Sequence, residues 1–131
     1  MRYAIISDIH GNLEALTAAL ETIDQRQAPR IVCLGDVVGY GASPDECVSL
    51  IRGRGIPTIL GNHDAVACGL EEPWGFNQVA LSAVKWTAEQ LSPENTAWLR
   101  ALPMNLEYES FLAVHATPEE SDWDYMFSWE E

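Results

Sequence analysis

Five side chains that could bind a metal ion each stand at or just after the end of a short apolar run. They are Asp8, His10, Asp36, Asn62 and His115. Carboxylate, imidazole and amide groups form a mixed oxygen and nitrogen ligand set, which suits Mn, Fe, Zn, Co or Ni and offers no thiolate to select a softer ion. A carboxylate has two oxygens and can therefore bridge two ions. Two ions held about 3.5–4 Å apart polarise a phosphoryl group and make hydroxide from bound water near neutral pH.

A further histidine, His63, stands inside "GNHD" (61–64), directly behind an apolar run. Gly, Asn and Asp alone are explained by a turn, because they tolerate the backbone conformations that turns require. An Asp-x-His, a Gly-Asp or a Val-His is weak evidence by itself, since each is also common in turns or in a protein core. Their conjunction at the ends of successive extended runs favours a metal site, with Asn62 as a ligand and His63 directed at what the metals hold.

The hydrophobic pattern of the first half predicts alternating strands and helices. We expect strands at 3–7, 30–34 and 56–60, and helices at 12–27 and from 43 to about 53–55. Asn12 is expected to cap the first helix, and Ser43, Pro44 and Glu46 to start the second with a capping box. This order predicts βαβ units and a parallel sheet. Ligands of such sheets bind beyond the carboxyl ends of the strands, where the candidate residues would meet.

The second half predicts a smaller set of elements. We expect helices at 76–90 and from 92 to before Pro103, an antiparallel strand pair at 105–109 and 111–115, and a loop with aromatic anchors at 119–131 in which Ser128 starts a helix. No stretch approaches the roughly 18 apolar residues of a membrane span, and no signal peptide is visible. Three cysteines without metal-like spacing fit buried, reduced thiols and a cytoplasmic location.

The charge of the chain limits its partners. Twenty acidic residues against seven Lys and Arg give a formal net charge of −13. Such a surface repels nucleic acid, so binding through a basic patch is not expected. It also repels small phosphate compounds unless bound cations are present, because a bound ion dominates the field around it.

Four blocks of the sequence together resemble the calcineurin-like metallophosphoesterase family, and closely its small bacterial members. They are "SDIHGN" (7–12), "LGDVVGYG" (34–41), "LGNHD" (60–64) and "LAVHATP" (112–118). The resemblance implies an α/β fold in which the layers form an α/β/β/α sandwich. It also implies a site for two divalent ions at the sheet edges. It implies that a metal-bridging hydroxide hydrolyses a small phosphodiester or phosphomonoester substrate. Manganese is the expected metal, with Fe, Zn, Co and Ni as alternatives.

The resemblance also implies a role for each candidate residue. Asp8 and His10 would bind the first ion, Asp36 would bridge both, and Asn62 and His115 would bind the second. His63 would contact the phosphate or protonate the leaving oxygen. Asp64 would orient His63 by accepting its other ring proton, although a carboxylate that caps nearby backbone N–H groups is an alternative. Asn12 is interpreted as a helix cap rather than a substrate contact.

One family block, a later Gly-His-x-His, has no counterpart here, because the chain contains only three histidines. We therefore expect a single domain over residues 1–131 that is shortened at its C-terminal side, an incomplete sandwich with a mostly parallel sheet. Its exposed sheet edge could pair with a second copy of the chain. The alternative to an active phosphoesterase is a catalytically defective metal-binding or interaction module.

Overall fold

Two short strands run side by side through the middle of the molecule. In the computed structural model, which describes residues 2–116, β1 (Tyr3–Ile6) pairs in parallel with β2 (Arg30–Cys33). Helix α1 (Leu13–Gln25) connects them, and its capping residue Asn12 accepts a hydrogen bond of 3.0 Å from the backbone N–H of Ala15. The predicted parallel α/β arrangement and the cap of the first helix are confirmed.

The third predicted strand, 56–60, is reduced to a single parallel bridge between Thr58 and Cys33. The segment still lies beside β2, because the backbone N–H of Cys33 donates to Pro57 and that of Ile59 donates to Cys33. Pro57 has no N–H to continue the ladder. The N–H of Leu60 donates to the carbonyl of Pro103 instead, at 2.8 Å. The prediction of this strand is therefore correct in its position beside β2 and wrong in its length.

Four further helices follow within residues 2–116. They are α2 (Pro44–Gly53), α3 (Asn62–Ala67), α4 (Gln78–Gln90) and α5 (Pro93–Arg100). The capping box predicted at Ser43 is wrong, because the Ser43 side chain makes no capping hydrogen bond. Its backbone, at φ −126° and ψ 56°, lies outside the extended conformation of typical capping residues. Helix α3 was not predicted: what the sequence suggests as a turn continues into a short helix.

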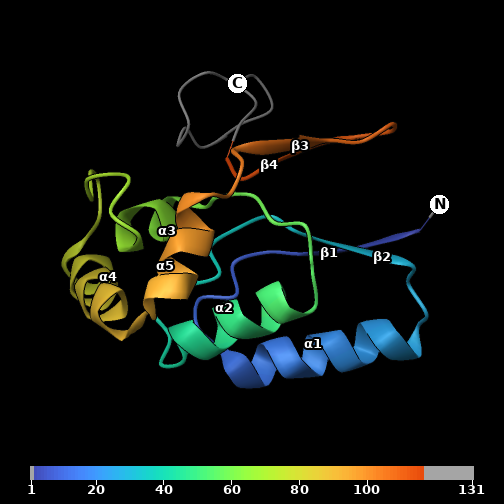
Figure 1. The fold of residues 1–131 in the computed structure, drawn as a ribbon, viewed down its shortest axis with the longest axis horizontal. Coiled ribbons are helices and arrows are strands. Elements are labelled where there is room, and N and C mark those ends of the chain that lie inside the picture. Colours follow the sequence, from blue (N-terminus) through green and yellow to red (C-terminus); the bar gives the residue numbers. More distant parts are fainter. Residues whose placement is uncertain (1, 117–131) are drawn as a thin grey trace.

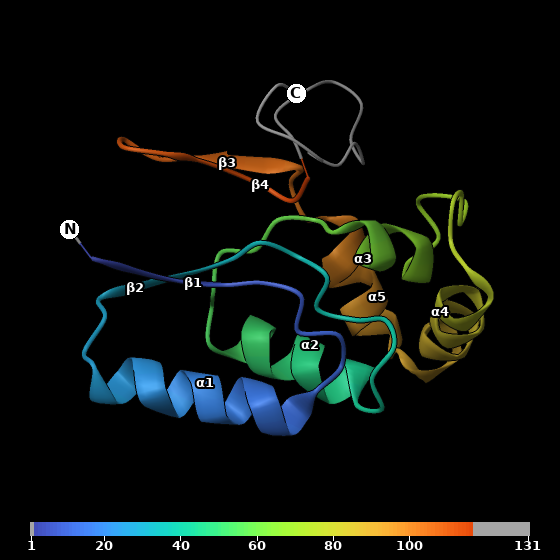
Figure 2. The same ribbon diagram turned by 180° about the vertical axis from the view of Figure 1, so that it is seen from behind.

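The elements form three layers, which Figure 1 shows in one view and Figure 2 from behind. Helices α1 and α2 cover one face of the parallel strands. The antiparallel pair β3 (Asn105–Glu107) and β4 (Leu112–Val114), as predicted at this place in the chain, lies over the other face. The ring of Tyr3 on β1 meets the rings of Tyr108 and Phe111 in edge contacts, with centroids 5.5 and 5.0 Å apart, and so joins the two strand layers.

The core lies between the helices and the parallel strands. Its fully buried side chains include Cys33, Val48, Ile51 and Leu99. All three cysteines are buried and free, as expected. No helix within residues 2–116 is long and apolar enough to cross a membrane.

Four expectations stay predictions. The interpretation of 119–131 lies outside the described residues, and the cytoplasmic location and the shortened C-terminal side are not tested by the fold. Pairing of two chains through a sheet edge is also untested. The edge strand β1 does expose Ile5, whose side chain is 53% accessible.

Candidate metal centre

The loop after β1 holds Asp8 and His10 in a rare backbone conformation. Their φ angles are 54° and 48°, in the left-handed region that non-glycine residues seldom adopt. The backbone N–H of Asp8 donates to the carbonyl of Gly35, and that of His10 donates to Asp36, each at 2.9 Å. These hydrogen bonds tie the loop after β1 to the loop after β2 and place both sets of candidate residues side by side.

Asp36 occupies the centre of the cluster and is 3% exposed. Its Oδ1 accepts a hydrogen bond of 3.0 Å from the backbone N–H of His63. Its Oδ2 lies 3.6 Å from Nε2 of His10 and 3.3 Å from Nε2 of His115. Gly61 is required beside it, because any Cβ there would collide with the backbone and side chain of Asp36. One carboxylate oxygen is thus fixed by the backbone, while the other faces two imidazoles.

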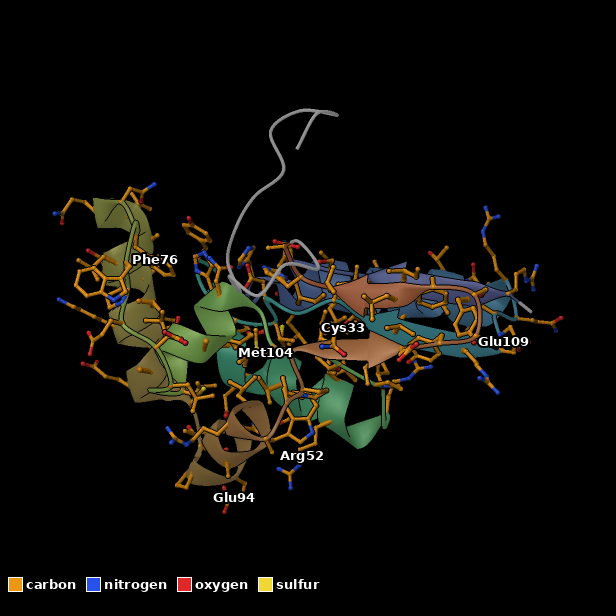
Figure 3. All side chains as sticks on the ribbon, turned by 90° about the horizontal axis from the view of Figure 1, so that it is seen from above. Cys33, Arg52, Phe76, Glu94, Met104 and Glu109 are labelled. Carbon is orange, nitrogen blue, oxygen red and sulfur yellow. The ribbon has the colours of Figure 1, made fainter. Side chains whose placement is uncertain are left out.

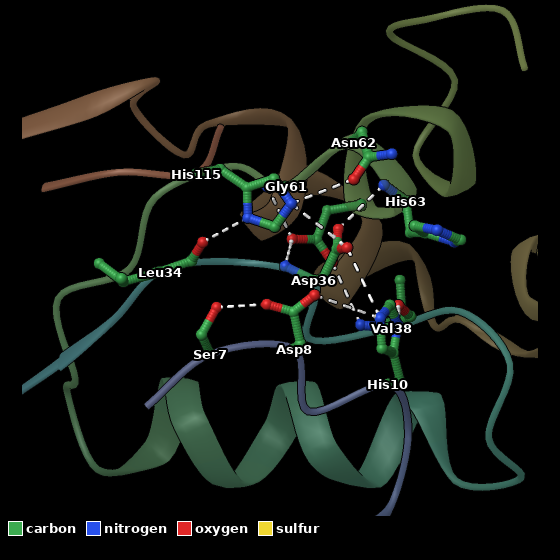
Figure 4. A network of polar contacts seen from close by, with 11 residues as sticks. Ser7, Asp8, His10, Leu34, Asp36, Val38, Gly61, Asn62, His63 and His115 are labelled. Carbon is green, nitrogen blue, oxygen red and sulfur yellow. Dashed lines mark hydrogen bonds and ion pairs between the residues drawn. The ribbon is translucent and has the colours of Figure 1, made fainter. Parts of the chain in front are cut away.

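Backbone carbonyls orient both of these imidazole rings. Nδ1 of His10 lies 3.0 Å from the carbonyl oxygen of Val38, and Nδ1 of His115 lies 2.7 Å from that of Leu34 (Figure 4). A carbonyl oxygen only accepts hydrogen bonds, so each Nδ1 carries the hydrogen. In the neutral ring the lone pair is then on Nε2, the atom that faces Asp36. Metal-binding histidines are typically fixed in this way.

Other electron-pair donors converge on the same place. Oδ1 of Asn62 lies 3.1 Å from Nε2 of His115, and Oδ1 of Asp8 lies 3.5 Å from Nε2 of His10. In the described part of the chain, two groups of side chains have ligand atoms that all lie within 4.8 Å of one another: His10, Asp36 and His63, and Asp8, Asp36 and His115. Asp36 belongs to both groups. The five predicted metal ligands are therefore brought together, and their binding of metal stays a prediction.

So many electron-pair donors in close contact require a cation among them. In the metal-free protein a proton on His115 takes this place. Burial alone would lower the pKa of His115, but the hydrogen bond and charge of Asp36 outweigh burial and raise the pKa to about 9. A divalent ion would satisfy the same donors with more charge. The residues present fit such an ion in ligand type, ring orientation and convergence.

Asp64 does not hold the ring of His63, contrary to the role that the family resemblance implies. Its two oxygens accept hydrogen bonds from the backbone N–H groups of Asp36, Val38 and Gly61, at 2.8, 3.1 and 3.0 Å. Nδ1 of His63 is buried and has no hydrogen-bond partner among the described residues. The alternative reading of Asp64, a carboxylate that caps nearby backbone groups, is the one that the structure shows.

Burial shifts the pKa of both side chains. Asp64 is fully buried, and its desolvation, with the negative charge of Asp36, raises the pKa to about 6 against the opposing backbone hydrogen bonds. Burial lowers the pKa of His63, which favours the neutral ring at pH 7. A neutral imidazole both donates and accepts a hydrogen bond, so His63 keeps a proton to offer to an oxygen atom.

Two aromatic residues that the sequence analysis did not single out, Tyr40 and Phe76, lie against the ring of His63 beside His10. Its ring centroid lies 4.9 Å from those of His10 and Tyr40 and 4.6 Å from that of Phe76. Figure 4 shows His63 on the side of the cluster away from His115. Tyr40 belongs to the block at 34–41, so that block could have indicated it. Phe76 has no motif around it, and only the tertiary structure places it here.

The fold and the cluster define a class of protein: an α/β domain with an oxygen and nitrogen metal site beyond the carboxyl ends of its parallel strands. Within that class, the chain belongs to the calcineurin-like phosphoesterase family, whose sequence model matches residues 1–129. It is 43% identical over 129 residues to the uncharacterized protein MJ0912 of Methanocaldococcus jannaschii. That match covers 95% of this chain and 53% of the relative. The chain thus spans about half the length of the curated relative that it matches.

Solved structures show the same relationship. A metallophosphoesterase from Sphaerobacter thermophilus is 41% identical with a TM-score of 0.78, over 96% of this chain and 51% of that one. The hypothetical protein PH1004 from Pyrococcus horikoshii is 27% identical with a TM-score of 0.72, over 80% and 49%. A putative diadenosine tetraphosphatase is 25% identical with a TM-score of 0.71, over 88% and 50%.

Proposed function

We propose that this chain carries the metal site of a phosphoesterase that uses two divalent ions to hydrolyse a small phosphodiester or phosphomonoester. The observation that carries the proposal is the position of Asp36, whose Oδ2 faces Nε2 of His10 and Nε2 of His115. A carboxylate shared by two ligand groups is what a two-ion site requires. Family membership supports the reaction class.

The family pattern assigns the ligands to the two ions. Asp8 and His10, whose Oδ1 and Nε2 lie 3.5 Å apart, would hold one ion, and Asn62 and His115, whose Oδ1 and Nε2 lie 3.1 Å apart, would hold the other. Bound divalent ions supply Lewis-acid stabilisation of the charge on a phosphoryl group and activate water. Manganese is the first candidate, because carboxylate and imidazole ligands accept it and the chain offers no thiolate at the site.

The protein's own contribution to the reaction centres on His63. Its backbone is fixed by the hydrogen bond to Asp36, and its ring lies between the metal ligands and the surrounding aromatic side chains. From there, the ring would donate a hydrogen bond to a phosphate oxygen or a proton to the leaving alcohol. Asp64 acts through the backbone: it accepts hydrogen bonds from three N–H groups and so holds the loop at 36–38 against the start of α3.

Hydrolysis of bis(p-nitrophenyl) phosphate with Mn²⁺ tests the proposal. We expect metal-dependent release of nitrophenol, abolished by Asp36→Asn and strongly reduced by His63→Ala. Glu21→Gln on the exposed face of α1 is the matched control and should leave the rate unchanged. Activity that survives both substitutions would rule the proposal out.

The alternative is a metal-binding module without turnover. It predicts that titration calorimetry detects Mn²⁺ binding in the wild type while no substrate is hydrolysed at any metal concentration. The two functions therefore differ in one measurement, made on the same protein sample.

A further inference from the structure

A pocket of about 370 Å³ opens beside the metal ligands, between the loop before α4 and helix α3. Among the residues that line it are Tyr40, His63, Glu71, Glu72, Trp74 and Phe76. His63 lines the pocket and is 7% exposed, while its Nδ1 is buried on the side of Gly39. The pocket thus adjoins the one side chain that would meet the leaving oxygen.

Three of the lining side chains are aromatic. Phe76 and Tyr40 contact the ring of His63, with centroids 4.6 and 4.9 Å away. Trp74 is 84% exposed, and Tyr40 is 47% exposed, so both offer ring surface to a ligand. Figure 3 shows Phe76 at the α4 end of the molecule, far from Glu109 on the hairpin. Aromatic faces attract weakly hydrated cations, above all quaternary ammonium groups.

The charge of the pocket has a single sign. Glu71 and Glu72 are exposed at its rim, and none of the described residues that line it is Lys or Arg. A leaving group that carries a further phosphate would be repelled here, whereas an ammonium group would be attracted by both the carboxylates and the rings. Exposed carboxylates are screened by water, so each contributes modestly.

We propose that this pocket receives the leaving alcohol of the substrate and selects one that carries an ammonium group. This inference rests on the proposed function. In the reaction, the oxygen of a water molecule forms a bond to phosphorus, the bond from phosphorus to the ester oxygen breaks, and that oxygen leaves as the alcohol with a proton. Trp74 and Phe76 contact the cation of that alcohol, and Glu71 and Glu72 balance its charge.

Two substrates that differ in one atom test the selection. The methyl phosphodiesters of choline and of 3,3-dimethylbutanol have nearly the same shape, but only choline is charged. We expect wild-type kcat/KM to favour the choline ester. Glu71→Gln combined with Glu72→Gln should lower this preference roughly fivefold. Trp74→Ala should lower it by a similar factor, about fivefold. The exposed residues Glu89 and Trp86 on α4 provide the matched controls Glu89→Gln and Trp86→Ala, which should leave it unchanged.

Binding of tetramethylammonium to the metal-free protein separates this inference from the proposed function. The backbone amide resonances of residues 70–72 and 74–77 should shift in a saturable way with tetramethylammonium and not with acetate, and Trp74→Ala should abolish the shift. Selective binding without hydrolysis of either ester would overturn the proposed function and support the preference of the pocket. Equal kcat/KM values for the two esters, in the wild type and in the pocket variants, would overturn the inference about the pocket and leave the proposed function in place.

Discussion

Nε2 of His115 lies 3.3 Å from Oδ2 of Asp36, although one residue follows β4 and the other follows β2. This contact joins the antiparallel hairpin to the parallel layer at the point where the candidate ligands meet. Nδ1 of the same ring is held by the carbonyl of Leu34. The hairpin therefore contributes a side chain to the candidate metal centre and is not only a cover for the sheet.

Asp36→Asn tests the central position of this carboxylate. The amide can still accept the hydrogen bond from His63, so the fold should be kept while the negative charge is lost. Because the carboxylate faces both ligand groups, we expect Mn²⁺ affinity to fall by more than the roughly 10–100-fold typical of a lost supporting residue. Titration calorimetry measures the affinity, with Glu21→Gln as the control. An unchanged dissociation constant would contradict the shared position of Asp36.

The raised pKa of His115 predicts how metal binding depends on pH. At pH 7 its ring is protonated in the metal-free protein, because its pKa is about 9. A metal ion must displace that proton, so apparent affinity should rise about tenfold per pH unit up to about pH 9 and then level off. Calorimetry in buffers of different ionisation enthalpy should detect one released proton. His115→Gln should remove this slope; if the slope persists, another group is titrating.

The same pKa shift makes the metal-free fold less stable as the pH rises. A pKa raised from 6.5 to about 9 stabilises the folded state fully below about pH 6.5, and this contribution is lost as the pH rises through about 9. Urea unfolding of the metal-free protein should therefore show lower stability at pH 9.5 than at pH 6.5. In the His115→Gln variant the difference should shrink, and an equal difference in both proteins would count against the assignment.

Asp64→Ala should destabilise the protein strongly. It removes the acceptor of three backbone N–H groups in a fully buried position. Each buried group left without a partner costs about 1–3 kcal/mol, so we expect a total loss of several kcal/mol in the free energy of unfolding. Glu89→Gln, an exposed change on α4, should have no effect in the same urea titration. A loss below about 1 kcal/mol would show that water replaces the carboxylate.

Gly39→Ala should disturb His63 without removing a metal ligand. Gly39 has a φ of 97°, and a Cβ there would stand 2.7 Å from Nδ1 of His63. Displacement of the ring by even 1 Å should lower kcat by about 100-fold. Mn²⁺ affinity should stay within a factor of about three, because the ligands themselves are unchanged. Gly53→Ala is the matched control, since a Cβ at Gly53 meets nothing within 4 Å. Equal kcat values for both variants would show that the ring position is unimportant.

Much of the fold and of the site follows from local patterns. Apolar runs ending in Asp8, Asp36 and Asn62 indicate parallel strands with ligands at one edge, because carboxyl ends of parallel strands share that edge. The cap at Asn12 follows from side-chain chemistry alone. The length of the third strand does not, since the N–H of Leu60 finds its acceptor in Pro103, far along the chain. Long-range competition for backbone hydrogen bonds is invisible in a short window of sequence.

By itself, the sequence determined which candidate ligand atoms this protein has and in which order they follow the strands. Only the tertiary structure decided what each atom faces. It turned Nε2 of His10 and His115 toward Asp36, gave the oxygens of Asp64 to backbone N–H groups instead of the His63 ring, and brought Phe76 against that ring. The physical reason is that a buried polar atom bonds to whatever partner the packing of distant segments brings within reach, and residue type does not specify that partner.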